Sequence, residues 1–316
     1  MITPSLVMLL AVTGVMSLLL CARANSVGSY FRLMDVPDAR KTHRKATPLM
    51  GGVILLLAFA PTASIYVLLH SSERWLPSLL IWVGCIAAMT LVGIADDRHS
   101  LSPRARLLIS FAIFVLAAVI DPTFNVRILE FQYPDWTLGL GTWWLAIVFT
   151  SICCVGLINA VNMADGKNGL VIGLCLGWLL LMSMRAPDAL LPVIALLAAA
   201  LIILLAFNLG GKLFLGDGGA YGLACALGLL AIMIYNSPGT HTQRAISADE
   251  LVVLFAIPVF DSFRLTFVRV RQGRSPMSAD RNHLHHLLQD KFGWPGGLLI
   301  YLIIAIVPAL VLMADK

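Results

Sequence analysis

Long apolar runs alternate with short polar segments along almost the whole chain. A helix needs about 20 mostly apolar residues to cross a bilayer, and lipid offers no partner to exposed backbone groups, so such runs predict helices. We expect ten spans, at 4–22, 50–69, 76–95, 105–121, 142–160, 169–185, 189–208, 219–236, 251–268 and 297–314. The pattern therefore predicts an all-α polytopic membrane protein, with residues 1–316 forming a single integral-membrane domain.

The polar stretch at residues 122–141 has a pattern of its own. Short alternating runs flank a Pro134–Asp135 turn, which predicts a small β-hairpin without chemistry. Composition supports the membrane assignment, because 59% of the residues are hydrophobic and only 12% are charged, against about 25% charged residues in soluble domains. We expect no nucleic-acid partner. The six cysteines lack metal-type spacing and are predicted to be reduced packing residues.

The distribution of basic residues predicts the orientation of the spans. A signal peptide requires basic residues before its apolar run, and none precedes the first run here, so we interpret that run as an uncleaved span with its N-terminus outside. With that start, 17 of the 22 lysines and arginines fall in inner loops and 5 on the outer side. Because positive charge favours the cytoplasmic side, this asymmetry supports ten spans with both termini outside.

Five polar segments fall on the predicted inner side, and the first two precede residue 100. Residues 35–52 are rich in arginine and lysine, so they form either a loop that sets the orientation or a clamp for phosphates. The second segment holds the adjacent carboxylates Asp96 and Asp97, which repel each other unless a divalent cation neutralises them. Oxygen ligands favour magnesium, although helix capping and solvation also explain many such pairs.

The third and fourth segments combine amides, carboxylates and glycines. Asn159, Asn162 and Asp165 recur at three-residue spacing, so on a helix they share roughly one face. Hydrogen bonding between spans is the alternative to contact with a ligand. In the fourth segment, residues 208–219, Asp217 lies among glycines that permit a ligand to approach the backbone closely.

The fifth segment, residues 264–286, gathers five arginines and three histidines at the edge of an apolar chain, and Asp261 precedes it in the ninth span. Guanidinium groups bind phosphate through paired hydrogen bonds, so the segment predicts contact with phosphates. Zinc is the alternative for His283, His285 and His286, although no cysteine thiolate is near. This arrangement is typical of a membrane enzyme that acts on phosphates.

In order, the segments carry the sequences DVPDARKTHRKATPLMGG, ADDRHSLSPRARL, NAVNMADGKNGL, FLGDGG and PVFDSFRLTFVRVRQGRSPMSADRNHLHH. They resemble the inner-loop motifs of the polyprenyl-phosphate N-acetylhexosamine-1-phosphate transferases, which are of the glycosyltransferase family 4 type. The resemblance extends from about Asp35 to His286. It is strongest to the branch that uses UDP-N-acetylglucosamine and undecaprenyl phosphate.

The resemblance implies an enzyme of the bacterial inner (plasma) membrane, whose active site is built from five cytoplasmic loops. Such an enzyme transfers N-acetylhexosamine 1-phosphate, here expected to be GlcNAc 1-phosphate, from a UDP-sugar to undecaprenyl phosphate and releases UMP. The product initiates a cell-surface polysaccharide such as O antigen. Magnesium, or manganese in its place, is the implied cofactor, and positioning supplies much of the catalysis. The resemblance alone also suggests a homodimer.

The resemblance further implies roles for individual residues. Asp217 is expected to bind the metal, with Asp96 also near it, while Asp96 and Asp97 orient or deprotonate the acceptor phosphate. The residues expected to hold the pyrophosphate are His283, His285, His286 and Arg281, with His285 and His286 counted as catalytic. The other expected substrate contacts are Lys41, His43, Asn159, Asn162, Asp165, Asn168 and Asn208.

Three positions depart from the family pattern. Asn168 stands where many members have Asp, Lys167 where they have an apolar residue, and Ala220 where Ser is frequent. Because the expected donor-binding loops contain these positions, a 6-deoxy donor carrying N-acetylfucosamine or N-acetylquinovosamine is the alternative sugar substrate. The alternative from another class is a lipid or anion transporter, but its polar residues would lie near the midplane of an internal repeat. The sequence lacks the DGxxAR pattern of the CDP-alcohol phosphotransferases.

Overall fold

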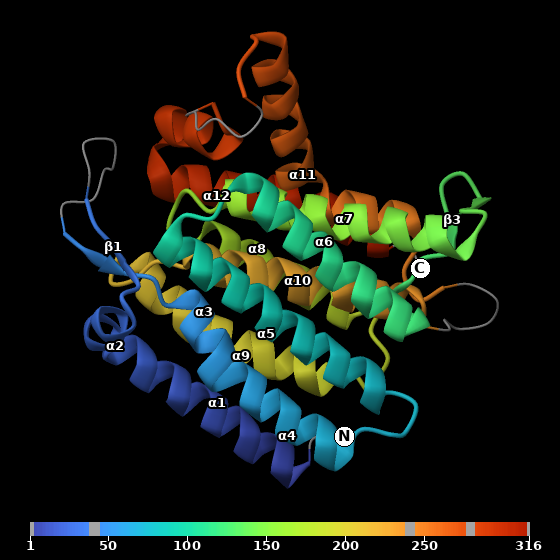
Figure 1. The fold of residues 1–316 in the computed structure, drawn as a ribbon, viewed down its shortest axis with the longest axis horizontal. Coiled ribbons are helices and arrows are strands. Elements are labelled where there is room, and N and C mark those ends of the chain that lie inside the picture. Colours follow the sequence, from blue (N-terminus) through green and yellow to red (C-terminus); the bar gives the residue numbers. More distant parts are fainter. Residues whose placement is uncertain (1–2, 38–44, 238–243, 276–281, 315–316) are drawn as a thin grey trace. The chain divides into compact units, whose positions relative to one another are not determined.

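The computed structural model describes residues 3–37, 45–237, 244–275 and 282–314 (Figure 1). Its contacts divide the chain into two compact units, Met1–Ser102 with Asp188–Ala226 and Pro103–Pro187 with Leu227–Lys316. Helix α10 (Gly216–Tyr235) contributes to both, because the division falls after Ala226. Each unit has its own group of polar residues.

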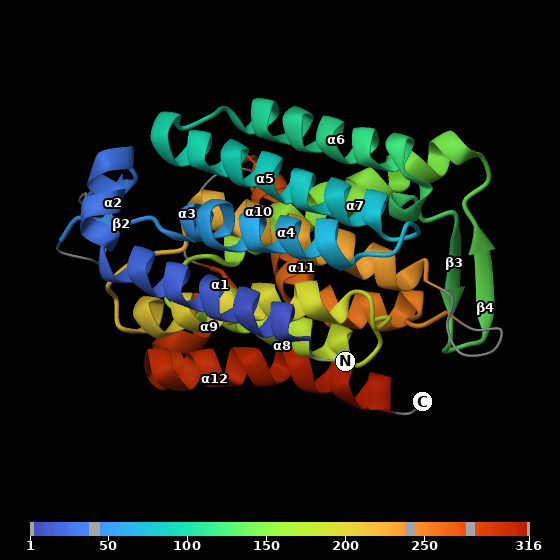
Figure 2. The same ribbon diagram turned by 90° about the horizontal axis from the view of Figure 1, so that it is seen from below.

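The first unit is helical apart from one short sheet. Its elements are α1 (Pro4–Ala22), α2 (Ala24–Phe31), β1 (Met34–Asp35), β2 (Thr47–Pro48), α3 (Gly51–Ile54), the π-helix η1 (Leu55–Phe59), α4 (Ala60–His70), α5 (Leu76–His99), α9 (Leu191–Leu209) and the first half of α10. Helix α1 packs against α9 and α4, and Figure 2 shows it beside α9. The hydroxyls of Thr13 and Thr62 are hydrogen bonded at 2.8 Å, which joins α1 to α4.

The second unit consists of helices and one β-hairpin, and α11 contacts the hairpin through β3. Its elements are α6 (Pro103–Ile120), the 3-10 helix η2 (Pro122–Phe124), β3 (Ile128–Phe131), β4 (Trp136–Gly139), α7 (Trp143–Ala164), α8 (Leu170–Ser183), the rest of α10, α11 (Ala248–Arg271) and α12 (Leu284–Ala314). Helix α11 packs against α7 and α12, and α12 packs against α8. Ser247 and Glu250 form a capping box that starts α11.

The expected spans are largely confirmed. Among the described residues, nine helices are long and apolar enough to cross a membrane, so the chain is an all-α polytopic membrane protein. The expected span at 169–185 instead forms α8, whose 14 residues reach only about 21 Å. The last expected span, 297–314, is the second part of α12, which starts at Leu284 and bends at Gly293, where φ is 70°.

Two antiparallel strand pairs complete the fold. The hairpin expected at residues 122–141 is confirmed, with β3 and β4 paired from Ile128↔Gly139 to Phe131↔Trp136. The Tyr235 hydroxyl anchors it, accepting from Glu130 N–H at 2.8 Å and donating to Ile128 C=O at 2.7 Å. The pair β1–β2 was not anticipated, because strands of two residues leave no alternating pattern in the sequence.

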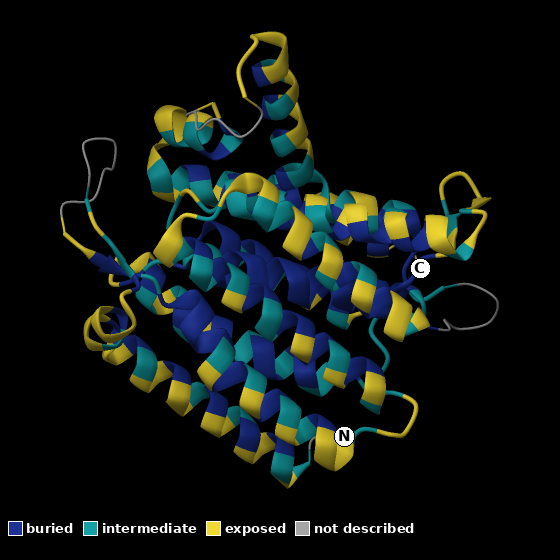
Figure 3. Ribbon diagram, viewed as in Figure 1, coloured by how far each residue is buried: buried dark blue, intermediate teal, exposed yellow. Residues whose placement is uncertain are grey.

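Burial follows the pattern expected of helices in lipid (Figure 3). The residues of α10 are buried from Gly218 to Tyr235, as its dark colour in Figure 3 shows. Helix α1 instead alternates between buried and exposed positions, and its exposed side chains include Val7, Met8 and Val15. Apolar side chains exposed in such number would be unfavourable in water but are the ordinary surface of a helix that contacts lipid.

Candidate functional site

Three carboxylates of the first unit form a carboxylate cluster, with Asp96 and Asp97 near the end of α5 and Asp217 at the start of α10. Asp97 Oδ1 accepts a 3.0 Å hydrogen bond from the backbone N–H of Asp217, and its Oδ2 accepts one of 3.0 Å from Gly218 N–H. N–H groups in the first turn of a helix lack partners within the helix, and its positive dipole end favours a carboxylate. Asp97 therefore caps α10 and fixes the turn that carries Asp217.

Asp96 is the most buried member of this cluster, with 6% of its surface exposed. Its Oδ2 accepts a 2.8 Å hydrogen bond from the hydroxyl of Tyr221, one turn further along α10. Its Oδ1 accepts one of 2.8 Å from Leu101 N–H. A buried carboxylate is strongly unfavourable unless it is hydrogen bonded, so these donors allow Asp96 to remain here.

A glycine allows α5 and α10 to come into backbone contact beside the cluster. A Cβ atom on Gly93 of α5 would collide with the carbonyl group of Asp217. Just before α10, Met50 N–H donates to Phe214 C=O and Gly51 N–H donates to Leu215 C=O, at 2.9 and 3.0 Å. The backbone is thus held both at Asp217 and in the residues that lead to it.

The carboxylate cluster provides oxygen ligands, which magnesium prefers. Asp217 is half-buried, whereas both oxygens of Asp96 and of Asp97 accept hydrogen bonds from the protein. Magnesium is usually held by one or two carboxylates together with waters and substrate phosphates, so this donor set fits that ion. Asn208, by contrast, donates through Nδ2 to Leu213 C=O at 3.0 Å and closes the turn that leads to α10.

In the second unit, polar residues gather at the end of α7. Asn159 and Asn162 lie in this helix, and Asp165 follows as its C-cap residue. Asn159 Nδ2 donates to Val155 C=O in the preceding turn at 2.8 Å, which turns its amide N–H toward its own helix. Asn162 and Asp165 are half-buried, so the three-residue spacing holds two amides on the helix and one carboxylate just beyond it.

The loop after α7 contacts the start of α12. A Cβ atom on Gly166 would lie 2.6 Å from His285 Nε2, and Trp294 Nε1 donates to Asn168 C=O at 3.0 Å. His285 is 1% exposed, and its Nε2 has no hydrogen-bond partner within the described part of the chain. The third and fifth polar segments are therefore brought together, as expected of parts of one site.

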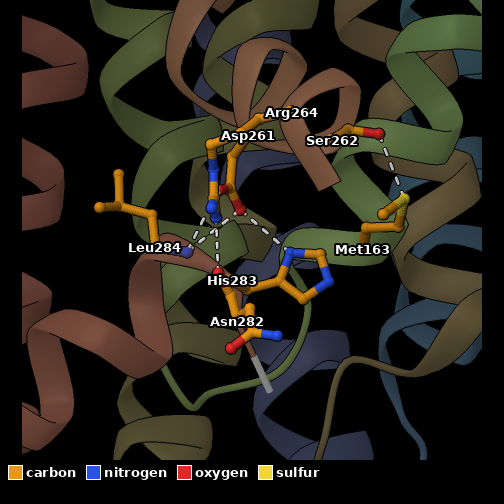
Figure 4. Close-up of polar contacts among 7 residues, drawn as sticks. All are labelled: Met163, Asp261, Ser262, Arg264, Asn282, His283 and Leu284. Atoms are coloured by element: carbon orange, nitrogen blue, oxygen red, sulfur yellow. Dashed lines mark hydrogen bonds and ion pairs between the residues drawn. The ribbon is translucent and has the colours of Figure 1, made fainter. Parts of the chain in front are cut away.

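A histidine cluster, consisting of Asp261, Arg264, His283 and His285, lies where α11 meets the start of α12. Figure 4 shows its first three members. His283 is 8% exposed, and its Nδ1 lies 3.0 Å from Asp261 Oδ2. The His283 and His285 rings are stacked with centroids 5.4 Å apart. The half-buried His286 ring follows at 4.3 Å from that of His285. Among the described residues, no three His, Cys, Asp or Glu side chains are grouped so that they alone could hold a metal ion, and this applies to the histidines and to the carboxylate cluster alike.

Some expected site residues are outside the described part of the chain, namely Lys41, His43 and Arg281. Sequence reasoning assigned no role to Asp261 and did not consider Tyr221. Asp261 carried a usable signal, because an ionisable residue inside a span is a functional candidate by default. Tyr221 carried none, since its link to Asp96 depends on how two helices pack.

Comparison with known proteins adds an independent finding. The model of the family described as glycosyl transferase family 4 matches residues 79–235, from α5 to the end of α10. The undecaprenyl-phosphate alpha-N-acetylglucosaminyl 1-phosphate transferase of Yersinia pestis is 29% identical over 274 residues, which cover 84% of this chain and 72% of that relative. Relatives of the same name in Escherichia coli (strain K12) and Salmonella typhi are 27% and 29% identical, and each alignment covers 84% of this chain and 71% of the relative.

The family match contains the carboxylate cluster and the polar end of α7, while the histidine cluster follows it in the chain. The expected motifs, the polytopic helical fold and these relatives thus agree over most of the sequence. The chain is similar to glycosyl transferase family 4 from α5 to the end of α10, and to these named transferases over 84% of its length.

Proposed function

We propose that this protein transfers an N-acetylhexosamine 1-phosphate, with GlcNAc 1-phosphate as the first candidate, from a UDP-sugar to undecaprenyl phosphate. The products are undecaprenyl-pyrophosphoryl sugar and UMP. The observation that carries the proposal is the hold of Asp97 on the backbone of Asp217 and Gly218, which keeps three carboxylates together at the start of α10. The names of the relatives support the choice of lipid and sugar.

In the proposed reaction, an oxygen of the lipid phosphate attacks the phosphorus that bears the sugar. The bond from this phosphorus to the oxygen of UMP breaks, so one phosphoanhydride replaces another and UMP leaves with the bridging oxygen. Asp217 would hold magnesium, or manganese in its place, and Asp96 is the second candidate ligand. The bound ion neutralises phosphate charge.

Asp96 and Asp97 act in this proposal as scaffold rather than as general base. The oxygens of both carboxylates already accept hydrogen bonds from N–H or O–H groups. A phosphate monoester has a second pKa near 6, so the acceptor is mostly dianionic at neutral pH and needs no base. The pair instead sets the position and the negative potential of the turn at Asp217.

The second unit is assigned to the donor. Asn162 and Asp165 would contact the nucleotide, and His283 and His286 would contact its pyrophosphate, together with Arg281. His285 is buried against Gly166, so we assign it the task of holding the loop after α7 in place. Lys41, His43, Asn159, Asn168 and Asn208 stay in the proposed set of substrate contacts.

Because nucleotide sugars are cytosolic, we propose that both groups of polar residues face the cytoplasm in a bacterial plasma membrane. We also propose that both chain termini lie outside, which requires the short apolar helix α8 to complete a tenth crossing in addition to the nine longer helices. The lipid-linked sugar would initiate a surface polysaccharide such as O antigen. A homodimer is proposed on the resemblance alone.

The decisive experiment is release of UMP by the purified protein, measured with undecaprenyl phosphate, magnesium and a panel of UDP-sugars. We expect turnover with UDP-N-acetylglucosamine and loss of turnover when magnesium is chelated. Turnover only with UDP-N-acetylfucosamine or UDP-N-acetylquinovosamine would support the same reaction with a different sugar. That result would agree with the departures from the family pattern at Asn168 and Lys167. No UMP from any donor, with folded protein, contradicts the transferase and favours transport.

A further inference from the structure

Asp261 is a charged residue within α11 to which the proposed reaction gives no task. Only 9% of its surface is exposed. An ionisable side chain in a membrane helix is costly, and it persists where partners satisfy it. In Figure 4, the carboxylate of Asp261 points toward the start of α12, where Arg264, His283 and Leu284 converge on it.

The contact with His283 fixes the state of the imidazole ring. Asp261 Oδ2 lies 3.0 Å from His283 Nδ1. An ionised carboxylate only accepts hydrogen bonds, so Nδ1 carries the proton in this pair. The other ring nitrogen, Nε2, is then left to accept from, or when protonated donate to, a different group.

Asp261 also anchors the helix that follows His283. The backbone N–H of Leu284, the first residue of α12, lies 3.2 Å from Oδ2 and 3.3 Å from Oδ1 of Asp261. Such an N–H has no partner within its own helix, so Asp261 caps α12 from another element. One carboxylate therefore holds both the ring of His283 and the backbone beside it.

Arg264 balances the charge of this carboxylate. Its Nη2 donates to Asp261 Oδ1 at 2.7 Å and to Asn282 C=O at 2.5 Å. Nearby, the Ser262 hydroxyl lies 3.2 Å from Met163 Sδ, so the same turn of α11 contacts the polar end of α7. The turn at Asp261 is thus fixed to both segments assigned to the donor.

We propose that Asp261 is a positioning residue, which accepts from Nδ1–H of His283 and holds the ring in one orientation, so that the protonated ring donates from Nε2 to the phosphate groups of the nucleotide-sugar donor. This inference rests on the proposed function. At metal-binding histidines, a carboxylate often accepts from the ring nitrogen that does not bind the metal, and it fixes the orientation of the ring. Removal of such a carboxylate typically lowers metal affinity or activity about 10- to 100-fold.

The kinetic test compares Asp261→Asn, His283→Gln and the double variant. Asp261→Asn is expected to lower kcat/KM for the UDP-sugar about 10- to 100-fold while the KM for undecaprenyl phosphate stays unchanged. If Asp261 acts through His283, the double variant is no slower than His283→Gln. The matched control is Asp290→Asn, because Asp290 is an exposed carboxylate on α12, and it should keep full activity. Losses that multiply in the double variant overturn the proposal.

A second readout does not depend on turnover. In protein labelled with ring-¹⁵N histidine, the Nδ1–H signal that disappears in His283→Gln belongs to His283. This signal should be lost or strongly shifted in Asp261→Asn, partly restored in Asp261→Glu and unchanged in Asp290→Asn. A signal that survives Asp261→Asn overturns the pairing. By contrast, wild-type protein that releases no UMP contradicts the proposed function. Failure of the pairing and failure of the proposed function are therefore detected by different measurements.

Discussion

The carboxylate cluster and the histidine cluster both hold charged groups in an apolar chain, but they use different partners. In the first, Asp97 accepts from two backbone N–H groups of α10, and α5 touches that backbone at Gly93. In the second, Asp261 also accepts from the backbone N–H of Leu284, but its link to His283 joins two side chains. A backbone partner is fixed by the path of the helix, whereas a side-chain partner can rotate away or be replaced.

This difference predicts how the two clusters respond to substitution. Changes that touch the backbone contact of the carboxylate cluster should disturb the fold together with activity. Changes in the histidine cluster should mainly affect the donor, because a side chain can adjust without moving a helix. The following variants are ordered from the largest expected effect to the smallest.

Asp217→Asn tests the metal assignment in the carboxylate cluster. The amide keeps the shape of the side chain but removes the charge that would hold the ion, so we expect turnover to fall at least about 1000-fold while folding is kept. UMP release and thermal unfolding in detergent measure the two effects. Asp135→Asn, in the exposed turn between β3 and β4, is the matched control and should behave as wild type. Normal turnover of Asp217→Asn would overturn the metal assignment.

The same substitution, glycine to alanine, compares the two clusters directly. At Gly93 the new methyl group meets the backbone of Asp217, and overpacking of this kind costs about 1–3 kcal/mol. At the exposed Gly166 it meets the ring of the buried His285, which is a side chain and not the backbone of another helix. We therefore expect Gly93→Ala to lower both the unfolding temperature and turnover. Gly166→Ala should keep the unfolding temperature and raise the KM for the donor. If Gly93→Ala and Gly166→Ala lowered the unfolding temperature equally, the proposed difference between the two clusters would be wrong.

Tyr221→Phe removes one hydrogen bond from Asp96 and leaves the packing intact. Because Asp96 Oδ1 keeps its bond from Leu101 N–H, we expect a loss of about 1 kcal/mol in the free energy of unfolding and a modest fall in turnover. Chemical denaturation and UMP release measure them. A loss of turnover as deep as that of Asp217→Asn would mean that Asp96 takes part in the reaction directly.

Cys153→Ala should be almost silent. Five of the six cysteines are buried thiols, as expected of packing residues, but Cys153 is exposed. It lines an apolar cavity of about 390 Å³ in the second unit, so removing its sulfur leaves no buried polar atom unpaired. Unchanged turnover and unfolding temperature are the expected results. A strong loss of turnover would indicate that the cavity, and not only the two clusters, takes part in the reaction.

The sequence predicted those parts of the molecule that depend on local pattern. Apolar runs located the spans, and the turn at Pro134–Asp135 located the hairpin. Residues at 169–185 are apolar enough for a span, yet the helix formed there ends at Ser183. Hydropathy alone does not report where a helix ends. For the same reason the expected final span missed the first turns of α12, which are polar and hold His285 and His286.

The site could be predicted as a set of residues but not as a set of contacts. Spacing identified Asp96, Asp97 and Asp217, but that Asp97 caps α10 depends on how two helices 120 residues apart in sequence meet. Asp261 was visible as an acid inside a span, yet no motif spacing linked it to His283. Partners of this kind become evident only in the folded chain, because tertiary packing brings them together.

The cap that Asp97 places on α10 has a consequence for how the sequence is free to change over evolution. Every amino acid except proline supplies a main-chain N–H, so the anchor of Asp97 does not depend on which side chains stand at 217 and 218. We therefore expect position 97 to stay constant in related lineages on its own account. Positions 261 and 283 are linked through their side chains, so the residue that suits one position depends on the residue at the other, and we expect the two to covary.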